Sequence, residues 1–261
     1  MRTTFCSKGC ALLFVIVLGL PALAWAQDKK PLPDRFHAEL GPFIVTNANT
    51  VVELAAVAGP ITAGTRIDFE DDLNIDDSDV VPRLDGYFRF GKRSRIDFTY
   101  WKIDRDGTTV TPFTIDFGDI NIPAGTTVNS FFDEELINLS YGFSFYNVPK
   151  AELGLKAGLF IADIGVGIEV VGGTLSESET VTLPLPVLGA YFRYDMGKRW
   201  RFRGDAQVFF LETDDFEGSL SDLRLSVEHQ TFRHLGFGFG FNRIATSLEV
   251  NDDDFRGEVG T

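Results

Sequence analysis

Large apolar residues alternate with glycine, one by one, along Leu235-Gly236-Phe237-Gly238-Phe239-Gly240-Phe241. Because successive side chains of a strand point to opposite faces, one face of this stretch is wholly aromatic or aliphatic and the other is nearly bare. The same two-residue period recurs along most of the chain, often with charges in place of the glycines. It predicts either a soluble β-sandwich with the apolar face inside or a closed barrel in lipid with that face outside.

The first 26 residues have the features of a secretory leader. Arg2 and Lys8 precede an apolar run at 11–20, and Ala24-Trp25-Ala26 is a typical cleavage motif. The apolar run is short for the alternative, an N-terminal membrane anchor. We therefore expect cleavage near Ala26 and one mature barrel domain over 27–261. Both cysteines, Cys6 and Cys10, lie in the leader, so we expect no disulfide in the mature chain.

The charge balance excludes one class of partner. The chain carries a formal net charge of −14, and removal of Arg2 and Lys8 with the leader makes it −16. Such an acidic chain is not expected to bind nucleic acid, whose phosphates need the opposite sign. No run of about 18 apolar residues follows Ala26, so no transmembrane helix is predicted.

Nine segments alternate over roughly the ten residues that a tilted strand needs to cross the apolar layer of a membrane. They are 35–45, 81–90, 95–104, 134–146, 151–164, 183–195, 199–211, 220–230 and 235–249. Aromatic residues gather at one end of these strands, as in an interfacial girdle; they are Phe90, Phe145, Tyr146, Tyr194, Trp200 and Phe232. Together with the leader, this pattern favours an all-β, antiparallel, up-and-down transmembrane β-barrel.

The connections alternate in length, which predicts orientation. Short basic turns near 91–94, 147–150, 197–198 and 232–234 are expected in the periplasm, because outer-membrane barrels have short turns there. Longer, acidic segments at 46–80, 105–133, 165–182 and 212–219 are expected outside the cell. Residues 113–121 alternate as well, and we expect them to extend the third and fourth strands beyond the membrane.

The chain resembles the small outer-membrane β-barrel proteins of Gram-negative bacteria, the OmpA/OmpW-like group. The resemblance rests on the leader, the Phe-Gly-Lys-Arg-Ser-Arg hairpin at 90–95, the Pro-Leu-Pro-Val-Leu-Gly stretch at 184–189, and the glycine–aromatic strand at 235–241. It implies the bacterial outer membrane as location. It also implies membrane lipid, lipopolysaccharide and the barrel-insertion machinery as partners. These motifs specify architecture and hardly any activity.

Strand count departs from that resemblance, which implies an even number. Residues 255–261 begin a tenth strand after the ninth. An open edge in lipid leaves unpaired backbone groups, each costing several kcal/mol. We therefore expect a ten-stranded barrel whose last strand is truncated in this sequence, and a monomer when complete. Eight strands remain an alternative if two segments lie in loops.

Candidate catalytic and metal residues are few. The three histidines, His37, His229 and His234, are expected as solvated residues at the periplasmic rim. No Ser-His-acid constellation and no G-x-S-x-G motif is visible, so neither catalytic residues nor a cofactor is predicted. The loop around 72–83 starts like a calcium loop but lacks its glycine and its last glutamate. No metal is predicted; a loose divalent site bridging to lipopolysaccharide is the alternative.

Charged residues on the polar face are expected to line the lumen. They are Glu39, Arg83, Asp85, Arg89, Asp97, Glu152, Lys156, Arg193, Arg201, Arg203, Asp205, Asp222, Arg224 and Glu228. Small barrels have interiors filled by side chains, and buried charges persist when paired, so a plug is favoured over a selective conduit. The function expected is structural, or binding through the acidic outer loops. A narrow channel for small solutes and a lipid-modifying enzyme are the alternatives.

Overall fold

The computed structural model describes residues 11–18, 35–45, 48, 50–58, 61–117, 120–197, 199–212, 216–232, 234–252 and 255–260. The two cysteines and the cleavage motif at 24–26 lie outside the described residues. The regular elements of the described part are all β-strands. No helix in this part is long and apolar enough to cross a membrane.

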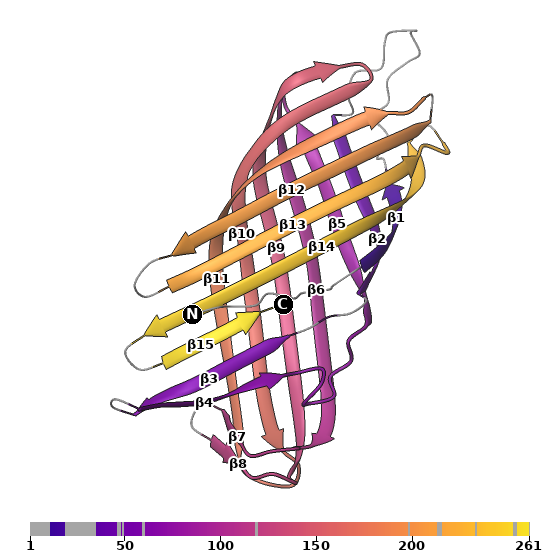
Figure 1. Cartoon of the computed structure of the whole chain (residues 1–261). Coiled ribbons are helices and arrows are strands. Elements are labelled where there is room, and N and C mark those ends of the chain that lie inside the picture. The colour runs from indigo at the N-terminus through magenta and orange to yellow at the C-terminus, as the bar shows by residue number, and fades with distance from the viewer. Residues whose placement is uncertain are drawn as a thin grey trace.

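Nine long strands match the nine predicted segments. They are β2 (Phe36–Val45), β5 (Asp79–Arg89), β6 (Ser94–Val110), β9 (Thr127–Val148), β10 (Ala151–Val170), β11 (Ser176–Asp195), β12 (Trp200–Glu212), β13 (Phe216–His229) and β14 (Leu235–Asp252). Each pairs antiparallel with the next one around a single curled sheet (Figure 1). The prediction of an all-β, up-and-down antiparallel barrel is therefore confirmed.

A tenth strand closes the sheet, but it comes from an unexpected segment. β1 (Ala11–Leu18) pairs antiparallel with both β14 and β2, so the sheet returns to its first strand. These residues belong to the predicted leader. The expected tenth strand, β15 (Phe255–Gly260), covers only the outer part of β14, because it contains six residues and pairs with Ser247–Asp252.

Much of the first predicted outer loop, 46–80, is in fact ordered sheet. Within 46–80, β3 (Val51–Ala58) and β4 (Ile61–Asp68) extend the sheet beyond β15. The turn at 69–78 then packs against β6: a Cβ on Gly107 would lie 2.7 Å from the carbonyl oxygen of Asn74. Five apolar residues of this region are buried, namely Val52, Ile67, Phe69, Leu73 and Ile75, so its interpretation as a loop is wrong. They lie at the end of the barrel that carries the long predicted connections, here called the outer end.

Residues 113–121 also depart from the prediction. They do not extend β6 and β9 but form a separate two-stranded sheet of β7 (Ile115–Phe117) and β8 (Ile120–Ile122). Pro112 and Pro123 flank this small sheet. β6 ends at Val110 and β9 begins at Thr127, so both long strands stop short of these two prolines.

The polarity of the two faces inverts along the strands. On β9 the outward residues Ile137 and Leu139 are apolar, whereas Asp133 and Glu135 occupy the same face nearer the outer end. The inward face changes the other way, and Leu136 is buried there. The apolar face therefore meets lipid only in the inner half. The expectation of one apolar outer face along whole strands fails beyond this point.

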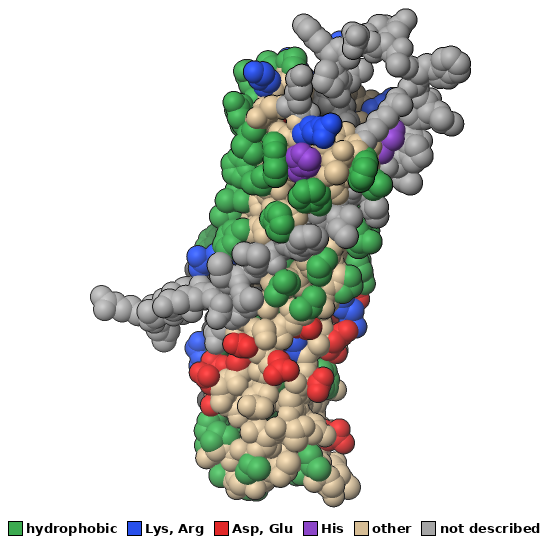
Figure 2. Space-filling model, turned by 90° about the vertical axis from the view of Figure 1, so that its right-hand side faces the viewer, with side chains coloured by type: hydrophobic (Ala, Val, Ile, Leu, Met, Phe, Trp, Pro, Cys, Tyr) green, Lys and Arg blue, Asp and Glu red, His purple; other side chains and the backbone are tan. Residues whose placement is uncertain are grey.

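The outer half of the barrel consequently has an apolar core of its own. Its buried residues come from the long strands, from β3, β4 and the 69–78 turn, and from β7 and β8; they include Phe43, Val52, Ile67, Phe69, Leu73, Ile75, Trp101, Ile103, Ile115, Phe117, Phe132, Leu136, Phe160, Ile164, Ile168 and Phe209. Figure 2 shows the acidic side chains in a belt across the lower part of the view, which is the outer half. Nine residues of β9, 127–135, rise about 20 Å beyond the apolar band at ordinary strand rise and tilt.

Candidate functional site in the charged lumen

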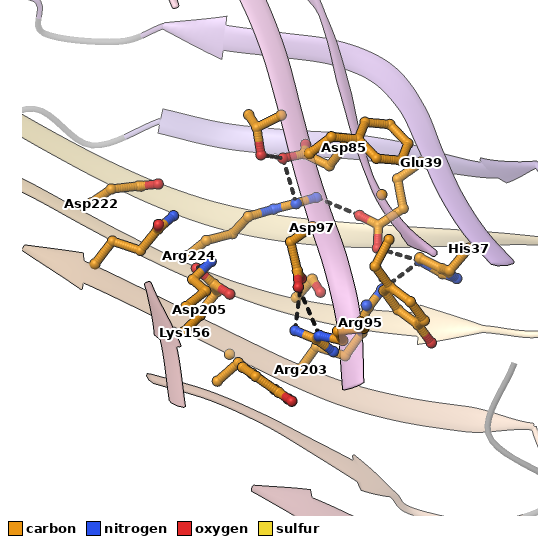
Figure 3. A pocket seen from close by; sticks show the side chains of 18 of the residues that line it. His37, Glu39, Asp85, Arg95, Asp97, Lys156, Arg203, Asp205, Asp222 and Arg224 are labelled. Atoms are coloured by element: carbon orange, nitrogen blue, oxygen red, sulfur yellow. Dashed lines mark hydrogen bonds and ion pairs between the residues drawn. The ribbon is translucent and has the colours of Figure 1, made fainter. Parts of the chain in front are cut away.

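Sixteen charged side chains converge in the inner half of the barrel. All fourteen predicted lumen residues make a charged or hydrogen-bonded contact there, and Arg95 and Asp195 join them. Eight are basic and eight are acidic, so the lumen is formally neutral although the chain carries −14. Figure 3 shows part of this network, contributed by strands on opposite sides of the barrel. The excess negative charge of the whole chain therefore lies outside the lumen.

One cluster lies near the inner end, around Glu152. This carboxylate is fully buried and accepts from Arg89 at 2.7 Å and from Arg193 at 3.3 Å. Arg193 also contacts Asp195, which in turn accepts from Arg201 at 2.9 Å. Because the charges alternate in sign along this chain of contacts, each is balanced by its neighbours.

A second cluster surrounds Glu39 on β2. Arg203 donates to this carboxylate at 2.5 Å, and Arg224 donates to its other oxygen. Arg224 continues to Asp85 at 2.8 Å, and Asp85 accepts from Arg83 at 2.9 Å. Two arginines thus bridge two carboxylates across the lumen, which fixes β2 and β5 against β12 and β13.

The remaining charges form two further ion pairs and one hydrogen bond to a neutral amide. Lys156 lies 2.5 Å from Asp205, and Arg95 lies 2.8 Å from Asp97. The Arg95 guanidinium stacks over the ring of Tyr191 at 3.4 Å, a cation–π contact. The last acid, Asp222, accepts from Asn242 at 2.6 Å.

Histidine placement corrects one expectation. His37 is not a solvated rim residue: it is buried, its Nε2 lies 2.6 Å from Glu39, and its ring stacks on Tyr87 with centroids 5.4 Å apart. It is buried because it occupies an inward position on β2. The other two histidines are partly exposed, and His229 packs between Trp200 and Phe237.

Three potential metal ligands meet in the lumen. Ligand atoms of His37, Glu39 and Glu228 all lie within 4.8 Å of one another. Arg203 contacts all three, donating to Glu228 at 3.2 Å. Its guanidinium already supplies the positive charge that a cation would bring. The group is therefore a complete ion cluster without a metal.

A further polar cluster, missed at the sequence level, lies inside the outer half. Arg105 donates to Thr50 at 2.5 Å and to Glu70, and Glu70 also accepts from the Thr50 amide at 2.6 Å. These contacts hold the 69–78 turn inside the barrel wall.

Glu134 is buried on the neighbouring strand, beyond the apolar band. Burial raises its pKa to about 7, and nearby Arg105 offsets only part of that effect.

A signal for these residues was present in the sequence. Arg105 lies at the inward parity of β6 that begins with Arg95, and Glu134 at the inward parity of β9. From the sequence, Arg105 falls in a predicted loop and Glu134 at a predicted strand end, where the period of two gives no clear face.

The charged lumen ends against the apolar core. Trp101, a core residue, lies directly opposite Arg83 in the β5–β6 register, so charge gives way to apolar packing within one residue pair. Charged groups lose several kcal/mol when they enter a medium without water or partners. The side-chain charges of the lumen therefore hold one another in place. The described residues offer no continuous polar path from one end of the barrel to the other.

Comparisons with known proteins concern the fold. No protein-family model matches the chain, and no curated protein matches it in sequence. The outer membrane protease OmpT from Escherichia coli has a similar structure, with 9% identity, a TM-score of 0.53 and coverage of 99% of this chain and 95% of that one. The translocator domain of autotransporter NalP from Neisseria meningitidis gives 12% identity and a TM-score of 0.40, covering 97% and 85%. At 9% identity, the likeness to OmpT shows the fold alone, which is that of a β-barrel of the bacterial outer membrane.

Proposed function

We propose that the chain is an integral outer-membrane barrel of the OmpA/OmpW-like kind, without enzymatic activity, that does not conduct solutes and acts at the cell surface in a structural or binding role. The observation that carries this proposal is the two-part interior: a formally neutral lumen of paired charges in the inner half, and a largely apolar core in the outer half. Membrane lipid and lipopolysaccharide would surround the apolar band. The barrel-insertion machinery would place it there, and a monomer is expected.

The outer wall supports a binding role. Asp104, Asp106, Asp133 and Glu135 point outward on β6 and β9, beyond the apolar band. Partial burial raises the pKa of Asp133, and the facing carboxylate of Asp104 raises it further. Like charges held this close repel each other, and Lys102 on the same face pairs with Asp104 and offsets part of that repulsion. One cation does not neutralise four carboxylates, so the approach of a further cation stabilises this wall. A partner with a basic surface is therefore favoured.

An enzymatic role has less support. OmpT is a protease, so hydrolysis by this chain deserves a test as an alternative. All three histidines of the sequence belong to the inner half or its rim, at the ends of β2, β13 and β14. A histidine-dependent site at the outer surface therefore lacks its general base.

Conductance in planar bilayers tests the closed interior. We expect the purified chain to be silent, whereas a general porin reconstituted in parallel gives open channels. Lys156→Gln should leave the silence unchanged, because the apolar core and not the charge of the lumen blocks the path. A steady ion current whose selectivity changes in Lys156→Gln would establish the channel alternative instead.

Binding to charged beads tests the surface role. Vesicles of zwitterionic lipid that carry the purified chain should bind polylysine-coated beads more than empty vesicles do, less so as salt rises, and should ignore polyglutamate-coated beads. The triple variant Asp104→Asn, Asp133→Asn, Glu135→Gln should lose this binding. A matched variant in the inner turn, Lys92→Gln, should keep it. Equal binding by the triple variant would contradict the proposal.

A further inference from the structure

A basic residue or histidine stands immediately before each strand that runs from the inner to the outer end. These strands are β2, β6, β10, β12 and β14, and the residues before them are Arg35, Arg93, Lys150, Arg199 and His234. We call these five residues the mouth ring. Its lysine and its arginines are exposed, and its histidine is partly exposed. Figure 2 shows basic side chains at the upper end of the view, which is the inner end.

Backbone hydrogen bonds fix most of the mouth ring to the end of the sheet. The carbonyls of Arg35 and Arg93 each accept from the neighbouring segment at 2.7 Å. The carbonyls of Lys150 and Arg199 do the same at 2.8 Å. The strand ladder therefore reaches these residues, and the period of two still applies to them.

That period places the mouth ring on the lumen side of the wall. Two residues further along their strands, His37, Arg95 and Glu152 are buried in the lumen. The position between, on β2 and β12, holds the apolar residues Phe36 and Trp200, which are exposed on the outer face. Residues two apart on a strand share a face, so the ring residues surround the mouth of the lumen.

The positive charge of the mouth ring has no counterion within the described part of the chain. Its lysine and arginine side chains make no ion pair or hydrogen bond with another described residue. The inner turns, 91–94, 147–150, 196–199 and 230–234, contain six lysines and arginines and no acidic residue. Asp195, the acid that ends β11, already contacts two arginines of the lumen. An acidic chain thus has an uncompensated positive ring at one end.

The dimensions of the ring suit an extended peptide. Ten strands surround the inner half, namely the nine long strands and β1. At a strand spacing of about 4.8 Å and a tilt of about 40°, such a barrel is about 20 Å across. An extended peptide advances about 3.3 Å per residue, so about six residues cross the mouth.

We infer that the mouth ring is a docking site for an acidic, extended segment of a soluble polypeptide. Three of its members, Arg35, Arg93 and Arg199, carry the planar guanidinium that binds a carboxylate through two parallel hydrogen bonds. Their position at the mouth, and not on the lipid-facing side, favours a soluble partner over a phospholipid headgroup. The compartment of that partner, the periplasm, rests on the proposed outer-membrane function, whereas the binding chemistry does not.

A fluorescent peptide of ten glutamates tests the site, with binding to the purified chain in neutral detergent followed by anisotropy. Detergent exposes both ends of the barrel, whereas in vesicles that display the outer wall the ring faces the interior. We expect binding that weakens as salt rises. Arg35→Gln and Arg93→Gln should each lower the affinity about two- to fivefold. Lys92→Gln, on the same turn but outside the ring, should leave it nearly unchanged.

A quadruple variant makes the test independent of the proposed surface role. Its substitutions are Arg35→Gln, Arg93→Gln, Lys150→Gln and Arg199→Gln. It should lose at least about tenfold in affinity for the glutamate peptide, since the small single effects accumulate. In vesicles it should still bind polylysine-coated beads as the parent does, because that binding depends on the outer wall. Retained bead binding also shows that the variant is folded.

Three results would overturn the inference. One is equal affinity of the parent and the quadruple variant for the glutamate peptide, and another is a loss in Lys92→Gln as large as in Arg93→Gln. The third concerns lipid extracted together with the chain from membranes. If the quadruple variant selectively lost phosphatidylglycerol relative to phosphatidylethanolamine, the ring would belong to a lipid headgroup site instead.

Discussion

At the scale of single residues, Glu134 is a buried carboxyl within an apolar core. It faces inward between Asp133 and Glu135, which face outward. Arg105 is the cation that lowers the pKa of Glu134, but its guanidinium already contacts Glu70 and Thr50. The charged form of Glu134 is therefore poorly compensated, and burial raises its pKa to about 7.

Replacement of Glu134 by glutamine should make stability less dependent on pH. In the unfolded chain this carboxyl titrates near its ordinary value of 4.5, whereas in the folded chain it keeps its proton up to about 7. Stability is therefore full below pH 4 and falls as pH rises through this window. Glu134→Gln should gain about 3 kcal/mol at pH 8 and nothing at pH 4, as measured by urea unfolding in detergent. The outward variant Glu135→Gln serves as control. An equal gain at both pH values would contradict the assignment.

The lumen shows what parity alone can predict about residues. Positions such as Lys156 and Glu152 could be assigned to the interior because they alternate with outward leucines on β10. Their partners could not be predicted. Arg203 and Glu39 are 164 residues apart, and only the curvature of the closed sheet brings them to 2.5 Å. Alternation defines a face, whereas pairing depends on barrel geometry.

At the scale of the element, β9 shows why the predicted strands were too short. The predicted strand begins at residue 134, whereas the observed strand begins seven residues earlier, at Thr127. Its period of two continues without a break, but the face that is apolar changes. An alternation pattern with one fixed apolar face therefore ends where that face becomes charged, although the strand continues. A strand that leaves the membrane needs this inversion, since its outer face then meets water.

Arginine substitutions along one face of β9 should locate the boundary. Leu139→Arg places a charge in the apolar band and should cost about 2–4 kcal/mol of folding stability in bilayers. Glu135→Arg, on the same face four residues toward the outer end, should cost little because water surrounds it. Urea titration of both variants in lipid vesicles measures the difference. Comparable losses would mean that the strand is not divided between lipid and water at this point.

At the scale of the whole molecule, closure is the feature that the sequence predicted least well. The outer core depends on β3, β4 and the 69–78 turn, whose acidic residues suggested a solvated loop. Their apolar residues, such as Ile67 and Phe69, are spaced by two and are fully buried. The same alternation was present there, but Pro60 and the run of acids at 70–72 masked it. The nine long strands were predictable; the source of the strand that closes the ring, and the strands β3 and β4 added at its outer end, were not.

Orientation of the whole barrel follows from the same two halves. The aromatic rim and basic turns mark the inner end, and the charged wall marks the outer end, so Asp106 should face the medium and Arg93 the periplasm. Cysteine replaces each residue singly in a processed chain that we expect to lack other cysteines. A membrane-impermeant maleimide should label Asp106→Cys on intact cells and Arg93→Cys only after the outer membrane is permeabilised. Leu155→Cys, which is 59% exposed but lies in the apolar band, should resist labelling in both cases because lipid covers it. Labelling of Arg93→Cys alone on intact cells would mean that the barrel has the opposite orientation. Efficient labelling of Leu155→Cys would mean that the apolar band does not lie in the membrane.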